Sequence, residues 1–91
     1  MKRYIIERDI PAVGSIEGEA LCSAAAKSND ALASLAPDIQ WLESFVTDDK
    51  TFCVYLAKDE AVINEHARRS GFPATKITEV RRIIDPTTAG D

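Results

Sequence analysis

The chain has 91 residues, of which 45% are hydrophobic and 29% charged, an ordinary balance for a globular protein. This length leaves room for a single domain, residues 1–91, and its formal net charge is −4. The acidic balance argues against nucleic acid as a partner, because nucleic-acid affinity depends on clustered lysine and arginine.

Cysteine usage and the N-terminal segment indicate a compartment. Two cysteines, Cys22 and Cys53, are too few for a disulfide framework. Residues 1–3 lead directly into a predicted strand rather than into a signal peptide, and no apolar run is long enough to span a membrane. We therefore expect a cytoplasmic protein with reduced thiols and no membrane partner.

The first half of the chain predicts a strand, a helix and a second strand. Residues 3–9 are β-branched at their centre and are followed by proline and glycine, which predicts the first strand. Ser15 is the expected N-cap of a helix whose apolar face recurs through about residue 35, and Pro37 ends it. Residues 39–47 then predict the second strand.

The second half repeats this pattern after a hairpin. A short acidic turn joins the second strand to a third one at residues 51–57. Asp59 is the expected cap of a second helix, and Gly71 occupies the position where such a helix stops. The last strand is expected over residues 76–84, and a frayed tail over 87–91.

The order of these elements is β-α-β-β-α-β with a central hairpin. This order predicts an α+β, ferredoxin-like fold, in which an antiparallel sheet has two helices on one face. The other face of the sheet then has no cover within one chain.

Side chains alternate between the two faces of a strand, so the sequence also predicts which residues lie on each face. The helices are expected to cover Tyr4, Ile6, Leu42, Val46, Phe52, Val54, Leu56, Val80 and Ile84. The uncovered face is expected to hold Ile5, Glu7, Trp41, Glu43, Phe45, Cys53, Tyr55, Ile77, Glu79, Arg81 and Ile83. Because monomers rarely expose so large an apolar patch, we expect a homodimer with its sheets face to face, a dimeric α+β barrel.

Ionisable residues among these aromatic side chains have two interpretations. Glu7, Glu43, Glu79 and Arg81 are costly to bury unless they are paired or liganded. Pairing of Arg81 with Glu79, or with Glu43 of a second copy, is the simpler interpretation. The functional alternative is a cavity between the sheets, where carboxylates bind a cation or act as a general base.

His66, the only histidine, falls on the inward stripe of the second helix. A single histidine in this position more often packs in the core than binds a ligand. As a metal-binding set, one histidine, one or two cysteines and several carboxylates suit a borderline divalent ion such as Ni²⁺, Zn²⁺ or Co²⁺. The sequence has none of the short His or Cys spacings that are typical of such sites.

A series of short segments, taken in order, resembles a known family. The segments are residues 4–8 (YIIER), 41–46 (WLESFV), 50–55 (KTFCVY), 65–67 (EHA), 70–74 (SGFPA), 79–82 (EVRR) and 84–86 (IDP). They resemble a family of small bacterial proteins that are described as nickel-binding or nickel-responsive. The resemblance covers nearly the whole chain except the first helix.

The resemblance implies a ferredoxin-like subunit, a dimeric barrel and Ni²⁺ binding in a sequestering or accessory role. His66 and Cys53 lie in matching motifs and are the first candidate ligands that it implies, followed by Glu7 and Glu43. It implies no organic cofactor.

Two other functions stay open. The first is a dimeric barrel enzyme of the monooxygenase or isomerase type, with Trp41, Phe45 and Tyr55 around a small-molecule pocket. Glu43 or His66 would be its base, and Arg81 would anchor an anion. This interpretation rests on fold analogy. A ligand-free interaction module would instead have every charge on the uncovered face paired. We expect metal binding rather than catalysis.

Overall fold

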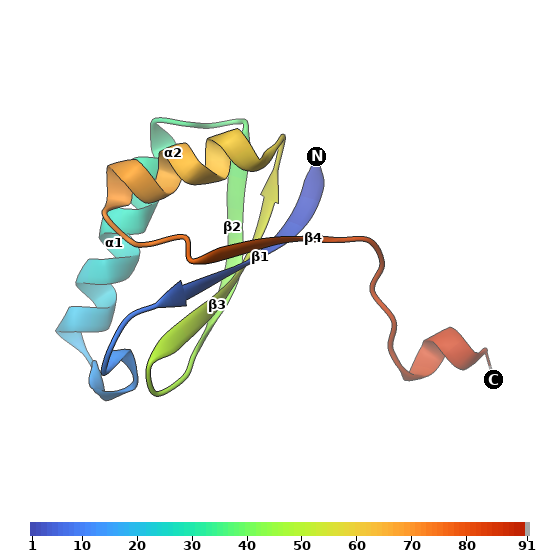
Figure 1. The fold of residues 1–91 in the computed structure, drawn as a ribbon, viewed down its shortest axis with the longest axis horizontal. Coiled ribbons are helices and arrows are strands. Elements are labelled where there is room, and N and C mark those ends of the chain that lie inside the picture. Colours follow the sequence, from blue (N-terminus) through green and yellow to red (C-terminus); the bar gives the residue numbers. More distant parts are fainter. Residues whose placement is uncertain (91) are drawn as a thin grey trace.

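Residues 1–90 are described by a computed structural model, in which two helices lie on the same side of a four-stranded sheet (Figure 1). The elements are β1 (Lys2–Asp9), α1 (Glu19–Ala33), β2 (Ile39–Val46), β3 (Lys50–Ala57), α2 (Glu60–Ser70) and β4 (Lys76–Val80), with short 3-10 helices at Val13–Ser15 and Pro86–Ala89. No helix within residues 1–90 has the length and apolar character needed to cross a membrane.

The strands are ordered β2-β3-β1-β4, and every neighbouring pair is antiparallel. The two strands that are each followed by a helix, β1 and β3, thus lie at the centre of the sheet. This order is that of the ferredoxin-like fold, so the predicted fold class is confirmed.

The ends of α2 follow the sequence signals, whereas the start of α1 does not. The Asp59 carboxylate accepts a hydrogen bond from the Val62 amide at 3.0 Å, and Gly71 closes the helix with a φ of +79°. Ser15 was predicted to be the N-cap of α1, and this is wrong. Its hydroxyl donates to the Ala12 carbonyl at 2.7 Å, and α1 begins only after Gly18.

The core lies between the helices and the sheet. Its buried members are Tyr4, Ile6, Ile39, Cys53, Tyr55, Ala57 and Ile63. From α1 only small side chains, Ser28 and Ala31, are buried, which lets this helix lie close to its neighbours. The helices therefore cover one sheet face, and they leave the other uncovered.

The face assignment is right for β1 and wrong for β3. Tyr55 pairs with Tyr4, and Cys53 with Ile6, so both β3 residues lie under the helices rather than on the uncovered face. Phe52, Val54 and Leu56, which were expected under the helices, lie on the uncovered face. Nearly every residue of β3 is apolar. Both faces of the strand are therefore apolar, and the sequence pattern does not show which of them faces the helices.

A bulge between Trp41 and Glu43 explains why the face assignment is right for part of β2 and wrong for Trp41. Trp41 pairs with Tyr55 under the helices, whereas Glu43, two residues later, pairs with Val54 on the uncovered face. The predicted position of Trp41 on the uncovered face is therefore wrong, because one extra residue changes the side to which the rest of the strand points.

The assignment for β4 is also inverted. Ile77 pairs with Ile6, and Glu79 with Tyr4, so both lie on the helix side, while Val80 pairs with Arg3 on the uncovered face. The predicted strand over residues 76–84 ends at Val80. Arg81, Ile83 and Ile84 lie beyond the sheet, and these positions therefore belong to neither face.

Residues 81–90 form an arm that projects from the body of the molecule (Figure 1). Its two isoleucines, Ile83 and Ile84, are 67% and 76% exposed. The predicted frayed tail is a 3-10 helix that Asp85 caps at its N-terminus, and Asp91 lies outside the described residues. The radius of gyration, 14.1 Å, exceeds the value of about 12 Å that is typical of a compact chain of this length.

Candidate functional site

A pocket of about 330 Å³ opens between α1 and the sheet. It is lined by Arg8, Ile10, Val13, Ile16, Leu21, Ala24, Ala25, Ser28, Trp41, Ser44, Val46, Thr51, Cys53, Tyr55 and Phe72. The alanines of α1 leave the space, because larger side chains at these positions would fill it. The volume is in the range of pockets that bind small organic molecules.

Arg8 is the only charged residue of this lining, and it is 3% exposed. Its Nη1 donates to the carbonyls of Phe72 at 3.2 Å and Pro73 at 2.9 Å, and its Nη2 donates to the Tyr55 hydroxyl at 3.4 Å. No carboxylate among residues 1–90 forms an ion pair with it. The guanidinium is thus a buried cation whose hydrogen-bond acceptors are all neutral oxygens, and its Cζ lies 5.9 Å from the centre of the Tyr55 ring.

Tyr55 connects Arg8 to His66. Burial raises the pKa of the Tyr55 phenol, although the Arg8 charge opposes the shift, so the hydroxyl remains protonated at neutral pH. Its oxygen accepts from Arg8, and the Ser28 hydroxyl is a second hydrogen-bond partner of the same phenol. On the other side, the Tyr55 and His66 rings are 5.4 Å apart between centroids, at an angle of 57°.

His66 is fully buried between α2, α1 and the sheet. Its Nε2 is 3.2 Å from the Ser28 hydroxyl, and its Nδ1 has no hydrogen-bond partner among the described residues. Burial, with a further contribution from the Arg8 charge, lowers its pKa to about 4. At neutral pH the imidazole is therefore neutral, which is the form that binds a metal.

The four residues predicted as metal ligands lie on two sides of the sheet. His66 and Cys53 both lie on the helix side, whereas Glu7 and Glu43 belong to the uncovered face. Within residues 1–90, no three or more His, Cys, Asp or Glu side chains come together in an arrangement that would hold a metal ion. The predicted set of four ligands is therefore not brought together within residues 1–90 of one chain.

Most of the charges that were predicted for the uncovered face are paired within the chain. Lys50 lies 3.6 Å from Glu7, and Glu79 is contacted by Arg81 at 3.3 Å and by Lys2 at 3.8 Å. The predicted pairing of Arg81 with Glu79 is confirmed. Glu43 has no ion pair with any other residue of the range 1–90, so the pairing expected of a ligand-free module is incomplete.

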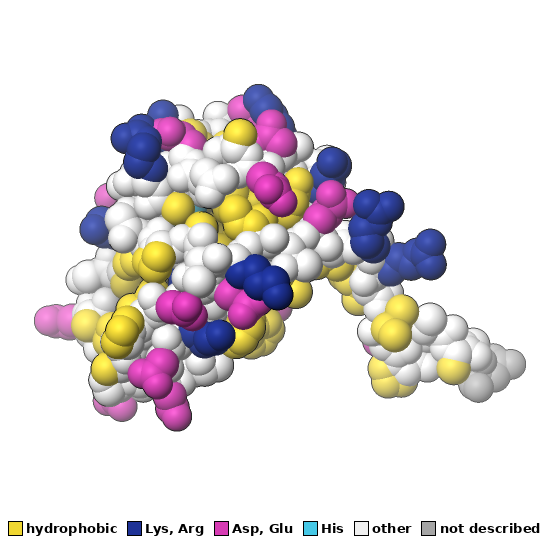
Figure 2. Space-filling model, viewed as in Figure 1, with side chains coloured by type: hydrophobic (Ala, Val, Ile, Leu, Met, Phe, Trp, Pro, Cys, Tyr) yellow, Lys and Arg dark blue, Asp and Glu magenta, His cyan; other side chains and the backbone are white. Residues whose placement is uncertain are grey.

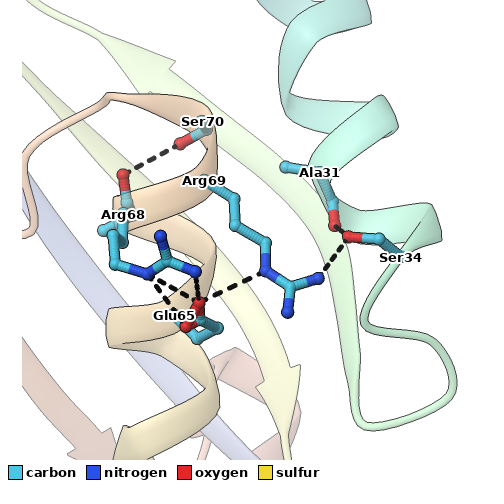
Figure 3. A network of polar contacts seen from close by, with 7 residues as sticks. Ala31, Ser34, Glu65, Arg68, Arg69 and Ser70 are labelled. Carbon is cyan, nitrogen blue, oxygen red and sulfur yellow. Dashed lines mark hydrogen bonds and ion pairs between the residues drawn. The ribbon is translucent and has the colours of Figure 1, made fainter.

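The adjacent arginines near the end of α2 make contacts within the protein (Figure 3). Arg68 forms an ion pair with Glu65, and this hydrogen-bonded pair lowers the pKa of the glutamate. Arg69 contacts Glu65 at 3.2 Å and reaches Ser34 at 2.8 Å, so it joins α2 to the residue that follows α1. Arg69 therefore connects α2 to the C-terminal end of α1.

The structure places some predicted pocket residues together and leaves others out. Trp41 and Tyr55 line the pocket beneath α1. Phe45 is 56% exposed on the uncovered face, and Arg81 is paired with Glu79 beyond the pocket. The cation of the pocket is Arg8, which the sequence analysis missed.

A signal for Arg8 was present in the sequence. It follows Tyr4 and Ile6 at intervals of two residues, and both of these were correctly predicted to lie under the helices. A charged residue at an inward position of a strand indicates a buried ion with polar partners, because a buried charge is costly without them.

Comparison with known proteins gives the family. Residues 4–80 match the model of the family described as nickel responsive protein SCO4226-like. The chain belongs to this family. The resemblance inferred from the sequence segments is thereby confirmed at the level of the family.

A solved structure supports the fold. The crystal structure of SCO4226 from Streptomyces coelicolor A3(2) superposes with a TM-score of 0.70, covering 90% of this chain and 99% of that chain. The two sequences are 16% identical, so this likeness concerns the fold alone. No curated protein matches the chain.

Proposed function

We propose that this nickel-responsive family member works as a homodimer that is formed through the uncovered sheet face. The observation that carries the proposal is the apolar character of that face. Its register brings together Ile5, Phe45, Phe52, Val54, Leu56 and Val80. Isolated monomers rarely expose a patch of this kind, and a second copy of the same face would bury it.

The area of the face indicates what else the dimer contains. Three strands of eight residues and one of five, at about 3.3 Å per residue and about 4.8 Å apart, give roughly 460 Å² of sheet plane. A stable interface buries about 800 Å² per partner. The projecting arm of residues 81–90 offers two exposed isoleucines, and Figure 2 shows hydrophobic side chains at its surface. We propose that each arm packs on the partner and supplies the remaining contact.

Substitution on the uncovered face tests the dimer. Phe45→Asp would place a charge in the contact and should shift the protein from dimer to monomer in sedimentation equilibrium at micromolar concentration. Ala26→Asp, on the exposed side of α1, is the matched control and should leave the dimer intact. A wild-type protein that sediments as a monomer would refute the proposed assembly.

A second candidate function is direct binding of a divalent metal, with Ni²⁺ first. It is favoured by the family description and by the neutral, unpartnered Nδ1 of His66. Cys53, on the same side of the sheet, would be the second donor, as a thiolate. Two protein ligands make an incomplete set, so weak binding is expected rather than tight sequestration.

Calorimetric titration of tag-free protein with Ni²⁺, Zn²⁺ and Co²⁺ tests this function. Saturable heat that disappears in both His66→Ala and Cys53→Ser would support a site on the helix side of the sheet. Loss of heat in Glu43→Gln alone would move the site to the uncovered face. Absence of saturable heat with all three ions would exclude direct metal binding and leave the dimer proposal unaffected.

A further inference from the structure

We propose that the pocket beneath α1 binds a small amphipathic organic anion, in which a carboxylate contacts Arg8 and an apolar body fills the space along α1. This inference concerns the helix side of the sheet. It is independent of the proposed dimer, which uses the opposite face.

The charge of Arg8 is the first step. A guanidinium has five N–H donors, and a buried one is strongly favoured by a partner of opposite charge. In this chain the Arg8 side chain reaches two carbonyls and one phenol, and no carboxylate of residues 1–90 pairs with it. It nevertheless lines the pocket. A ligand carboxylate would supply the missing negative charge.

Tyr55 gives the site a second donor. Its hydroxyl oxygen already accepts from Arg8, and its hydrogen can be donated to a ligand oxygen in place of the neighbouring Ser28 hydroxyl. The raised pKa of the phenol keeps that hydrogen in place at neutral pH. A guanidinium and a neutral hydroxyl side by side favour an acceptor with two oxygens, such as a carboxylate.

The remaining walls determine the rest of the ligand. Beyond the polar end, the lining is mainly aliphatic and aromatic, with Ile10, Val13, Ile16, Leu21 and Trp41 among its members. A volume of about 330 Å³ accommodates a chain or ring system of small-molecule size. An apolar body gains free energy from burial here, whereas a highly charged ligand such as a nucleotide would meet no further cations.

Trp41 provides the measurement, because it is the only tryptophan and it lines the pocket. Titration with octanoate should change its fluorescence saturably. Octanamide has the same chain and no charge, and it should bind at least about tenfold more weakly, because a charge-assisted hydrogen bond is lost. Equal binding of the two compounds would overturn the role of Arg8.

Two variants test separately the charge of Arg8 and the volume of the pocket. Arg8→Met should bring the affinities for octanoate and octanamide together. Ala25→Leu keeps the arginine and fills the pocket, and it should abolish binding of both compounds. Ala26→Leu adds the same side chain on the exposed side of α1 and should bind as the wild type does.

Each outcome decides the proposal. Circular dichroism checks that every variant folds. If Arg8→Met fails to fold, the comparison of octanoate with octanamide in the wild type still tests the role of the charge, and Ala25→Leu with Ala26→Leu still tests the pocket. No saturable change with either compound in the folded wild type, or binding that Ala25→Leu leaves intact, would overturn the pocket as a ligand site.

Discussion

At the scale of single residues, two buried polar side chains distinguish this protein from an ordinary packed core. His66 is neutral and leaves one ring nitrogen without a partner, and Arg8 is a cation whose hydrogen-bond acceptors are all neutral oxygens. Tyr55 lies between them, and the Arg8 charge opposes protonation of the histidine. A cation and a neutral imidazole therefore share one side of the sheet, close to the pocket.

The lowered pKa of His66 predicts a dependence of stability on pH. The folded protein prefers the neutral ring, so the stability that this preference contributes is fully present above pH 6.5 and decreases as the pH falls below that value. This contribution is lost completely only below about pH 4. A shift from 6.5 to about 4 corresponds to about 3 kcal/mol.

Urea unfolding between pH 7.5 and 4.5 measures this contribution. Over this pH range His66→Gln should remove about 2.5 kcal/mol of the pH-dependent loss, even if it lowers stability at pH 7.5. Because carboxylates titrate in both proteins, only the difference between the two slopes is attributed to the histidine. Identical slopes would mean that the ring is not buried as described.

At the scale of elements, the stop of α2 positions the partners of Arg8. Gly71 ends the helix in a left-handed conformation, and the chain then turns so that the Phe72 and Pro73 carbonyls accept from the guanidinium. The site thus depends on one helix end as well as on β1 and α1. Lys27 lies over the Phe72 ring at 5.6 Å and connects the same turn to α1.

Gly71→Ala should lower the free energy of unfolding by about 1 kcal/mol, because a side chain disfavours a φ of +79°. Gly90→Ala is the matched control. It has a φ of +88° in the projecting arm, outside the core, and it should leave the unfolding midpoint unchanged. Denaturant titration of both variants gives the comparison, and equal effects would show that the turn after α2 is not coupled to the core.

At the scale of the whole molecule, the two sides of the sheet differ in what covers them. The helix side encloses the core and the pocket, and the other side, with the arm of residues 81–90, remains open within one chain. The long axis of the molecule, 44 Å against 29 and 20 Å, reflects the arm.

Truncation after Val80 should weaken the dimer at least about tenfold while leaving the sheet and both helices formed, because Ile83 and Ile84 would no longer be buried against the partner. Sedimentation over a range of concentrations measures the dissociation constant, and circular dichroism reports the fold. The double substitution of Ile83 and Ile84 by serine is the control that keeps the chain length. An unchanged dissociation constant in both proteins would exclude the arm from the interface.

The order of the elements, the fold class and the ends of α2 can be predicted from the sequence, because turn residues, caps and periodicity are local signals. The inward positions of Tyr4 and Ile6 can be predicted as well, since the alternate residues of β1 are mostly charged. The direction of β3 follows only from its neighbours in the sheet, because an apolar strand at the centre of a sheet takes its face from the register. The bulge after Trp41 and the short β4 depend likewise on contacts between segments far apart in the chain, and periodicity along one strand carries no record of them. The spacing along β1 indicates the inward position of Arg8, but its acceptors at Phe72 and Pro73 follow only from the tertiary structure.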